Sequence, residues 1–172
     1  MNVSDLTTSE YDTYYGNYIS KVSNEMTLAE GFKQGEQRVL NFFKSIPNDK
    51  LEYRYAPDKW SIKDVFQHVI DTEQIFMYRC FRIARHDKNP LAGFEQDDYI
   101  APSKANDKSL DHLIEEYQAV RQNFKVLLKS LKDEDLKCMG TASGSPLSSR
   151  AAAFIILGHE IHHMAVIKER YL

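Results

Sequence analysis

The sequence predicts an all-α protein, a four-helix bundle with a crossover connection and short extra helices. Residues that break helices are scarce, since the 172 residues include only 7 Gly and 5 Pro, whereas an all-β chain turns about every 8–12 residues. Between the breakers, apolar residues recur at spacings of three and four, which is the helical period. The last such segment is apolar almost all round, and a helix of that kind is enclosed by others.

The length and composition describe one ordinary domain, residues 1–172, with no charge that favours a nucleic acid or a membrane surface. Lys and Arg number 22 and Asp and Glu 25, which gives a formal net charge of −3. No apolar run is long enough to cross a membrane, and the first residues lack the pattern of a secretory signal. Cys80 and Cys138 lie far apart without a CxxC partner, so we expect two ordinary thiols in a cytoplasmic protein.

Three helices are predicted in the first half of the chain. Residues 9–22 carry four tyrosines on one side of a short helix. These are Tyr11, Tyr14, Tyr15 and Tyr18. Residues 27–45 repeat apolar side chains at helical spacing. The clearest helix spans residues 61–85, because Ser61 offers a hydroxyl cap, Asp64 follows three residues later, and apolar residues then recur at three and four.

The second half begins with a connection and ends with two more helices. Residues 86–108 are interrupted by Pro and Gly, and we expect a crossover with one short helix around residues 97–100. A fourth long helix starts near Ser109. Residues 140–146 contain two Gly and one Pro and form the longest clear loop. The last helix starts near Ser148 and runs close to the C-terminus.

The last helix carries three histidines, His159, His162 and His163, on a mostly buried surface. Buried imidazoles are unfavourable unless each is hydrogen-bonded or bound to something. At 100° per residue, His159 and His163 lie about 40° apart on one face. Imidazoles one turn apart form a natural pair of metal ligands. His162 lies about 60° to the other side of His159 and pairs with it less well.

A third ligand would come from earlier in the chain, and His68 is the candidate. It lies on the flank of its helix's apolar stripe, where a bundle seam brings it towards a neighbouring helix. His86, in a charged run, and His112, beside acidic residues, fit solvated positions better. The residues alone leave two interpretations open. One is a divalent metal site made by His68, His159 and His163, and the other is a set of histidines that are ordinary satisfied polar residues.

Residues 159–163 also fit the H-E-x-x-H pattern of zinc proteases, in which Glu160 would be the general base. Those enzymes take their third metal ligand from further downstream. Only residues 164–172 follow His163, and none of them is His. We therefore do not expect a protease.

Glu73 is a second anomaly, because a carboxylate falls in the centre of an apolar helix stripe. Like Asp71, it would be placed to hold the outer nitrogen of a ligating histidine. It would also serve as a general base near a water on the metal. The interpretation we favour is a salt bridge with an arginine such as Arg79, Arg82 or Arg150, since buried carboxylates are usually paired.

At these residues the sequence resembles the DinB/YfiT-like superfamily of metal-binding four-helix bundles. The Trp-Ser-Ile…His and His-x-x-His-His elements carry the resemblance in combination. The matching segments are residues 53–62, 68–73, 78–87, 94–99 and 158–172. They occur in the right order and span nearly the whole chain after Thr7.

The resemblance implies a bundle with a crossover and a metal ion, typically zinc or nickel, held by His68, His159 and His163. His162 is not carried over as a ligand. Some members of the family transfer low-molecular-weight thiols such as bacillithiol or mycothiol, others are described as metal-dependent hydrolases, and dimers are common.

We therefore expect first a metal-dependent thiol S-transferase that resembles the bacillithiol transferases. A hydrolase that uses metal-bound water is the second expectation, and a non-catalytic protein that binds a metal or small ligand is the third. The expected partners are a small-molecule substrate and a second copy of the chain, with no nucleic acid and no membrane.

Overall fold

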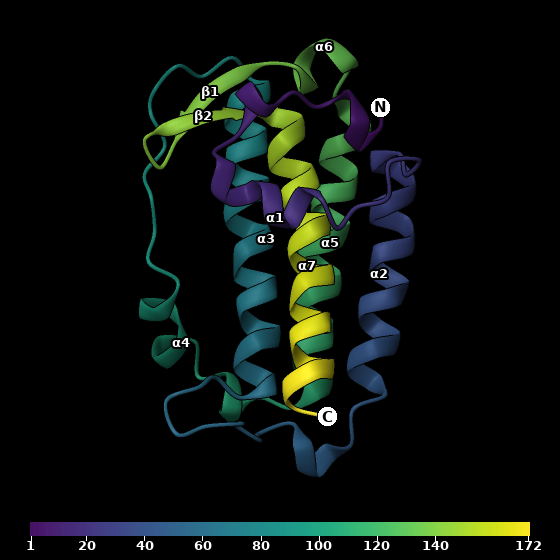
Figure 1. Ribbon diagram of the computed structural model, residues 1–172, viewed down its shortest axis with the longest axis vertical. Coiled ribbons are helices and arrows are strands. Elements are labelled where there is room, and N and C mark those ends of the chain that lie inside the picture. The colour runs from purple at the N-terminus through teal and green to yellow at the C-terminus, as the bar shows by residue number, and fades with distance from the viewer.

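Four long helices form a bundle in the computed structural model, which describes residues 1–172 (Figure 1). They are α2 (Leu28–Lys44), α3 (Ile62–Ala84), α5 (Leu110–Ser130) and α7 (Ser149–Arg170). Each lies where the apolar period of the sequence predicts a helix. The observed helix ends agree with the predicted ones within about one or two residues, the usual uncertainty of helix boundaries. The predicted fold class therefore agrees with the observed architecture.

The helices do not simply alternate in direction. α2 and α7 run one way, while α3 and α5 run the other, so α3 and α5 are parallel (Figure 1). Residues 85–109 connect these two by running back along the outside of the bundle, as a parallel pair requires. This crossover carries α4 (Asp97–Ser103), at the place where the sequence predicts a short helix.

Capping side chains explain where the long helices begin. At the start of α3, Ser61 Oγ accepts a hydrogen bond from Asp64 N at 3.0 Å, and Asp64 Oδ2 accepts one from Ser61 N at 2.9 Å. Thr27 and Glu30 make the same reciprocal pair at the start of α2. Each pair satisfies backbone N–H groups that a helix end leaves without partners.

Residues 9–22 differ from the prediction, because they do not form one continuous helix. The Asp12 carboxylate accepts a hydrogen bond from Tyr14 N at 2.9 Å and starts a new 3₁₀ turn at Thr13–Tyr15. A single short helix, α1 (Gly16–Ile19), follows. An aspartate that bonds to the backbone two residues ahead favours a turn over a continuing helix, so the tyrosines are carried on broken turns.

Residues 140–146, predicted as a loop, belong to a β-hairpin instead. Its antiparallel strands are β1 (Met139–Ala142) and β2 (Ser145–Ser148). The two residues between them, Ser143 and Gly144, have φ angles of 52° and 79°. Two successive positive φ values are typical of the primed turns that close two-residue hairpins. Leu91 N donates to Thr141 O at 2.9 Å, so the hairpin also anchors the start of the crossover.

The remaining short elements lie at the ends of the bundle. They are α6 (Asp133–Leu136) and the 3₁₀ turns Val3–Asp5, Thr8–Glu10, Asn48–Lys50 and Ala105–Asp107. We call residues 1–27 the N-terminal strap, because this segment crosses the outer side of α7 (Figure 1). The strap is anchored by a two-pronged ion pair in which Arg150 donates to both Glu10 oxygens, at 2.7 and 2.6 Å.

One glycine fixes how closely the strap approaches α7. A Cβ atom at Gly158 would collide with the backbone carbonyl of Tyr18, so only glycine allows α1 to lie against the helix at this point. Gly158 immediately precedes His159. The strap therefore covers α7 at the level of the histidines.

The apolar core consists of two clusters at opposite ends of the bundle. One contains Phe32, Phe76, Phe124 and Phe154, and the other contains Phe43, Phe66, Tyr117 and Ile167. Along α3, α5 and α7, buried charged or imidazole side chains lie between the two clusters. No helix combines the length and the low polarity needed to cross a bilayer.

Candidate metal centre

The structure brings together the three histidines that the sequence singles out. His159 Nε2 lies 3.0 Å from His68 Nε2 and 3.0 Å from His163 Nε2. One ring nitrogen from each of the three lies within 4.8 Å of the other two. His68 comes from α3, and the other two come from successive turns of the antiparallel neighbour α7.

Two of the three nitrogen separations fit a shared cation. Two nitrogens that each lie about 2.0–2.1 Å from one zinc ion are roughly 2.8–3.4 Å apart at coordination angles near 90–110°. The two nitrogen pairs at 3.0 Å fall in that range. Three imidazoles are also the donor set of known catalytic zinc sites. The residues present therefore suit a divalent metal ion.

Burial keeps the imidazoles in the form that binds a metal. His68 and His159 are each 4% exposed, and His163 is half-buried. Burial lowers the pKa of His68 to about 4 and holds the pKa values of His159 and His163 well below the usual range, with nearby histidines adding to the effect. All three rings are then neutral at pH 7 and have a lone pair to donate.

Aromatic side chains enclose the cluster. The Trp60 ring lies 4.8 Å from the His68 ring, centroid to centroid, and Tyr18 lies 5.2 Å from His159. The His162 ring lies 5.3 Å from the Tyr18 ring and is not part of the three-nitrogen cluster. Trp60 and Tyr18 thus limit how the ligating rings can turn.

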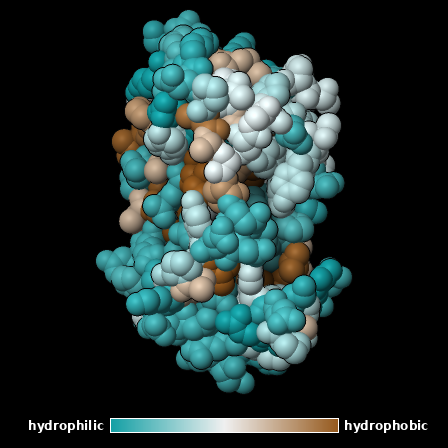
Figure 2. Space-filling view, turned by 90° about the vertical axis from the view of Figure 1, so that its left-hand side faces the viewer, coloured by the Kyte–Doolittle hydropathy of each residue, from teal (hydrophilic) through white to brown (hydrophobic).

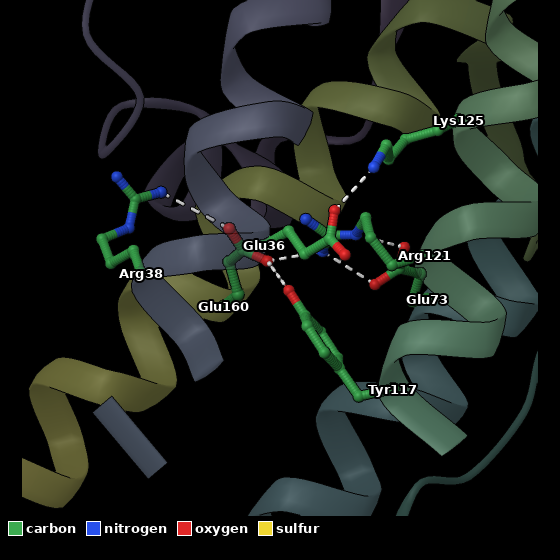
Figure 3. A network of polar contacts seen from close by, with 7 residues as sticks. All are labelled: Glu36, Arg38, Glu73, Tyr117, Arg121, Lys125 and Glu160. Atoms are coloured by element: carbon green, nitrogen blue, oxygen red, sulfur yellow. Dashed lines mark hydrogen bonds and ion pairs between the residues drawn. The ribbon is translucent and has the colours of Figure 1, made fainter. Parts of the chain in front are cut away.

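Glu73 lies in a buried ion network and not against an imidazole (Figure 3). Arg121 Nε and Nη2 donate to its two oxygens at 2.7 and 2.8 Å. The expected salt bridge is present, but its partner is none of the arginines named from the sequence. Arg79 bonds to Ser143 and the Ala92 carbonyl, Arg82 pairs with Asp87, and Arg150 pairs with Glu10.

Glu160 occupies the other side of the same network (Figure 3). Arg121 Nη2 donates to it at 2.6 Å, Tyr117 Oη at 3.3 Å and Arg38 Nη2 at 3.4 Å. A carboxylate with three donors on it is not available as the general base of a zinc protease. The H-E-x-x-H pattern therefore contributes two histidines to the cluster, whereas its glutamate contributes to the packing of three helices.

The other sequence candidates lie apart from the cluster. Asp71 accepts a hydrogen bond from Gln67 Nε2 at 2.9 Å and holds no histidine. His86 is exposed at the end of α3, and exposed His112 pairs with Glu116 on its own helix at 2.9 Å. These two histidines are solvated, as their charged surroundings predict.

A pocket of about 300 Å³ opens onto the cluster at His159. Tyr14, Tyr15 and Tyr18 of the strap form one wall, and Thr72 and Phe76 of α3 form another. Residues 94–96 of the crossover, Ser143 at the hairpin tip and Ile155 of α7 complete it. Figure 2 views the side of the molecule that carries the crossover, where apolar side chains show between hydrophilic ones.

Several residues of the site escape the sequence-based prediction. Arg121 had a signal, because it follows Tyr117 by four and precedes Phe124 by three, on the buried stripe of α5. Thr72 had one too, because it follows His68 by four residues on the same helix. Tyr18 had none, because the strap's path over α7 is a tertiary feature that local periodicity does not encode.

The comparisons with known proteins agree with this fold. The sequence profile described as the DinB superfamily matches residues 32–167. Among solved structures, the chain is similar to YfiT from Bacillus subtilis, described as a probable metal-dependent hydrolase with an unusual four-helix bundle topology. The TM-score is 0.74 at 13% identity, over 95% of this chain and 89% of that one. No curated protein matches. The predicted helical-bundle fold and family resemblance are thereby confirmed.

Proposed function

Because the chain belongs to the DinB superfamily, we propose that it is a metal-dependent hydrolase of small molecules whose metal is held by His68, His159 and His163. The observation that carries the proposal is the meeting of three neutral imidazole nitrogens, 3.0 Å apart in two pairs, at the end of a pocket. The description of YfiT as a probable metal-dependent hydrolase supports it. Zinc and nickel are the ions we propose, since both accept imidazole ligands.

A divalent cation supplies Lewis acidity, which polarises a substrate carbonyl and lowers the pKa of a bound water or thiol. The chain's own contribution is to hold three uncharged donors, which leave the cation's positive charge undiminished and coordination positions open. Tyr18 and Trp60 pack on the ligating rings and fix their orientation. The strap covers the site from outside and limits access to the pocket.

A second candidate function is transfer of a low-molecular-weight thiol, which the same geometry also suits. Two buried carboxylates, those of Glu73 and Glu160, lie on the helices that carry the three histidines. Arg121 binds both of them. Neither of these two buried carboxylates is therefore free to take a proton from water beside the imidazoles. A thiol, with an ordinary pKa near 8.5, loses its proton far more readily than water and needs no such base.

Metal analysis tests the site itself. The purified protein should hold one divalent ion per chain, and His159→Ala or His163→Ala should abolish tight binding. His162→Ala is the matched control, because this residue lies on the same helix and outside the cluster. Full metal content in both ligand variants would refute the assignment.

Activity then separates the two reactions. The zinc- or nickel-loaded protein is incubated with small esters and amides, or with a small electrophile plus L-cysteine as thiol. Cleavage without thiol supports the hydrolase, whereas loss of thiol together with the electrophile supports the transferase. Metal binding with neither reaction would contradict both enzymatic functions and leave a binding protein.

A further inference from the structure

The pocket over the cluster has a distinctive composition. Five of its lining side chains are aromatic rings, Tyr14, Tyr15, Tyr18, Phe76 and Phe94. Its volume of about 300 Å³ is at the small end of the range for small-molecule sites. Rings of this kind pack against flat or apolar bodies, so the pocket is shaped for a compact ligand with such a body.

The charge of the lining restricts the ligand further. His159 is neutral at pH 7, so the one side chain in the lining that carries a charge is Glu95, and no Lys or Arg takes part. A carboxylate or phosphate on the ligand would therefore meet no cation of the protein there, and Glu95 would repel it. An uncharged ligand avoids that cost.

Thr72 adds a specific observation. It is 3% exposed, and its Oγ1 makes no hydrogen bond with any protein group. A threonine inside a helix commonly bonds to the carbonyl one turn back, and here it does not. Buried hydroxyls without a hydrogen-bond partner are rare, so this one needs a structural or functional explanation.

The position of Thr72 supplies the explanation. It follows His68 by four residues on α3, so both side chains lie on the same face of the helix. It also lines the pocket that ends at His159. The residue that carries the unpaired hydroxyl thus lines the space next to the metal ligands, where a substrate would be the missing partner.

We propose that Thr72 is a substrate-positioning residue, whose hydroxyl donates a hydrogen bond to the carbonyl oxygen of a small uncharged substrate seated among the strap tyrosines. The inference rests on the proposed metal-dependent function, which it extends to the class of substrate. It predicts that, without the metal, uncharged amides and esters with a compact apolar body are bound in preference to carboxylates. The interaction involves no covalent step, and the ligand's acceptor oxygen replaces the partner that Oγ1 lacks.

The test is a binding experiment that does not depend on turnover. Benzamide and benzoate are titrated by NMR against the full-length protein, both zinc-loaded and metal-free. Thr72→Val removes the hydroxyl at constant shape, and Thr72→Ser retains it. Loss of one hydrogen bond should weaken benzamide binding about three- to tenfold in Thr72→Val, while Thr72→Ser should bind like the wild type. Benzoate should bind no more tightly than benzamide to the metal-free protein.

Ser149→Ala is the matched control for a structural hydroxyl. Ser149 is fully buried like Thr72, but its Oγ donates to the Cys80 carbonyl at 3.0 Å and it lies outside the pocket. Ser149→Ala should therefore lower the melting temperature and leave benzamide affinity unchanged. Thr72→Val should weaken benzamide binding without lowering the melting temperature, because it removes no hydrogen bond from the free protein.

The outcomes separate this inference from the proposed function. Unchanged benzamide affinity in Thr72→Val, tighter binding of benzoate by the metal-free protein, or no binding of benzamide at all would each overturn the inference. If Thr72→Val weakens benzamide binding in both the zinc-loaded and the metal-free protein but no ester or amide is hydrolysed, the inference is retained and the hydrolase is overturned.

Discussion

Replacing Arg121 by Met should expose how much the buried ion network contributes to stability. Arg121 is 0% exposed, and the two carboxylates that it binds, on Glu73 and Glu160, belong to side chains that are 1% exposed. Removing one member of such a network leaves buried charge without compensation, which costs about 3–5 kcal/mol. In a domain of this size, each kcal/mol shifts the melting temperature by roughly 2–4 °C. We therefore expect a loss of about 6–20 °C at pH 7.

The loss should depend on pH in a defined direction. Without Arg121, burial raises the pKa of the Glu73 carboxyl further above the unfolded value near 4.3, because the arginine's lowering effect is lost. A group with a raised folded pKa contributes stability below the unfolded pKa and loses it as pH rises. The difference between Arg121→Met and the wild type should therefore be largest at neutral pH and shrink towards about pH 4.

Urea unfolding at several pH values measures this effect. A triple variant, Arg121→Met with Glu73→Gln and Glu160→Gln, removes the charges together and should recover much of the lost stability. Lys125→Met is the control, because its pair with Glu36 is partly exposed, and such a pair is worth at most about 1 kcal/mol. A loss below about 1 kcal/mol for Arg121→Met, or one that does not vary with pH, would refute the reasoning.

Three further outcomes follow. Gly158→Ala should lower the melting temperature measured by circular dichroism, because a Cβ collides with the Tyr18 carbonyl; Gly16→Ala, where a Cβ meets nothing within 4 Å, should not. The free energy of unfolding of the metal-free protein, measured in urea titrations, should fall as pH is lowered from about 6.5 to 4. In that range the unfolded chain binds a proton that buried His68, with its pKa lowered to about 4, does not. A free energy that stays constant over this range would contradict the prediction. Zinc at 100 times its dissociation constant should add about 2.7 kcal/mol to the unfolding free energy, an increase that a chelator should remove.

The sequence predicts those parts of the structure that local chemistry controls. Ser61 and Asp64 mark the start of α3 through their own side chains, and the apolar period gives its length. The separation of His159 and His163 by one turn puts both on one face whatever the rest of the chain does. These features depend on helix geometry alone, which is why they agree with the structure.

Two of the parts that were wrong depend on contacts between distant segments. The hairpin at Ser143 and Gly144 has short strands with little apolar alternation, and it is held partly by pairing with Leu91. The Ser-Gly pair was its one local signal. The partner of Glu73 was missed because Arg121 is 48 residues away, and sequence does not reveal which arginine a packed helix delivers.

The placement of the histidines has a topological consequence. His68 and His159 are 91 residues apart, so a cation bound to both would close a ring that contains the crossover, α5 and the hairpin. Residues 1–67, including the strap and α2, lie outside this ring. Detachment of α2 leaves the ring closed, whereas α3 and α7 cannot separate until a coordination bond breaks. Metal-loaded protein should therefore open in two stages, with exchange of amide hydrogens in α2 preceding that in α3 and α7.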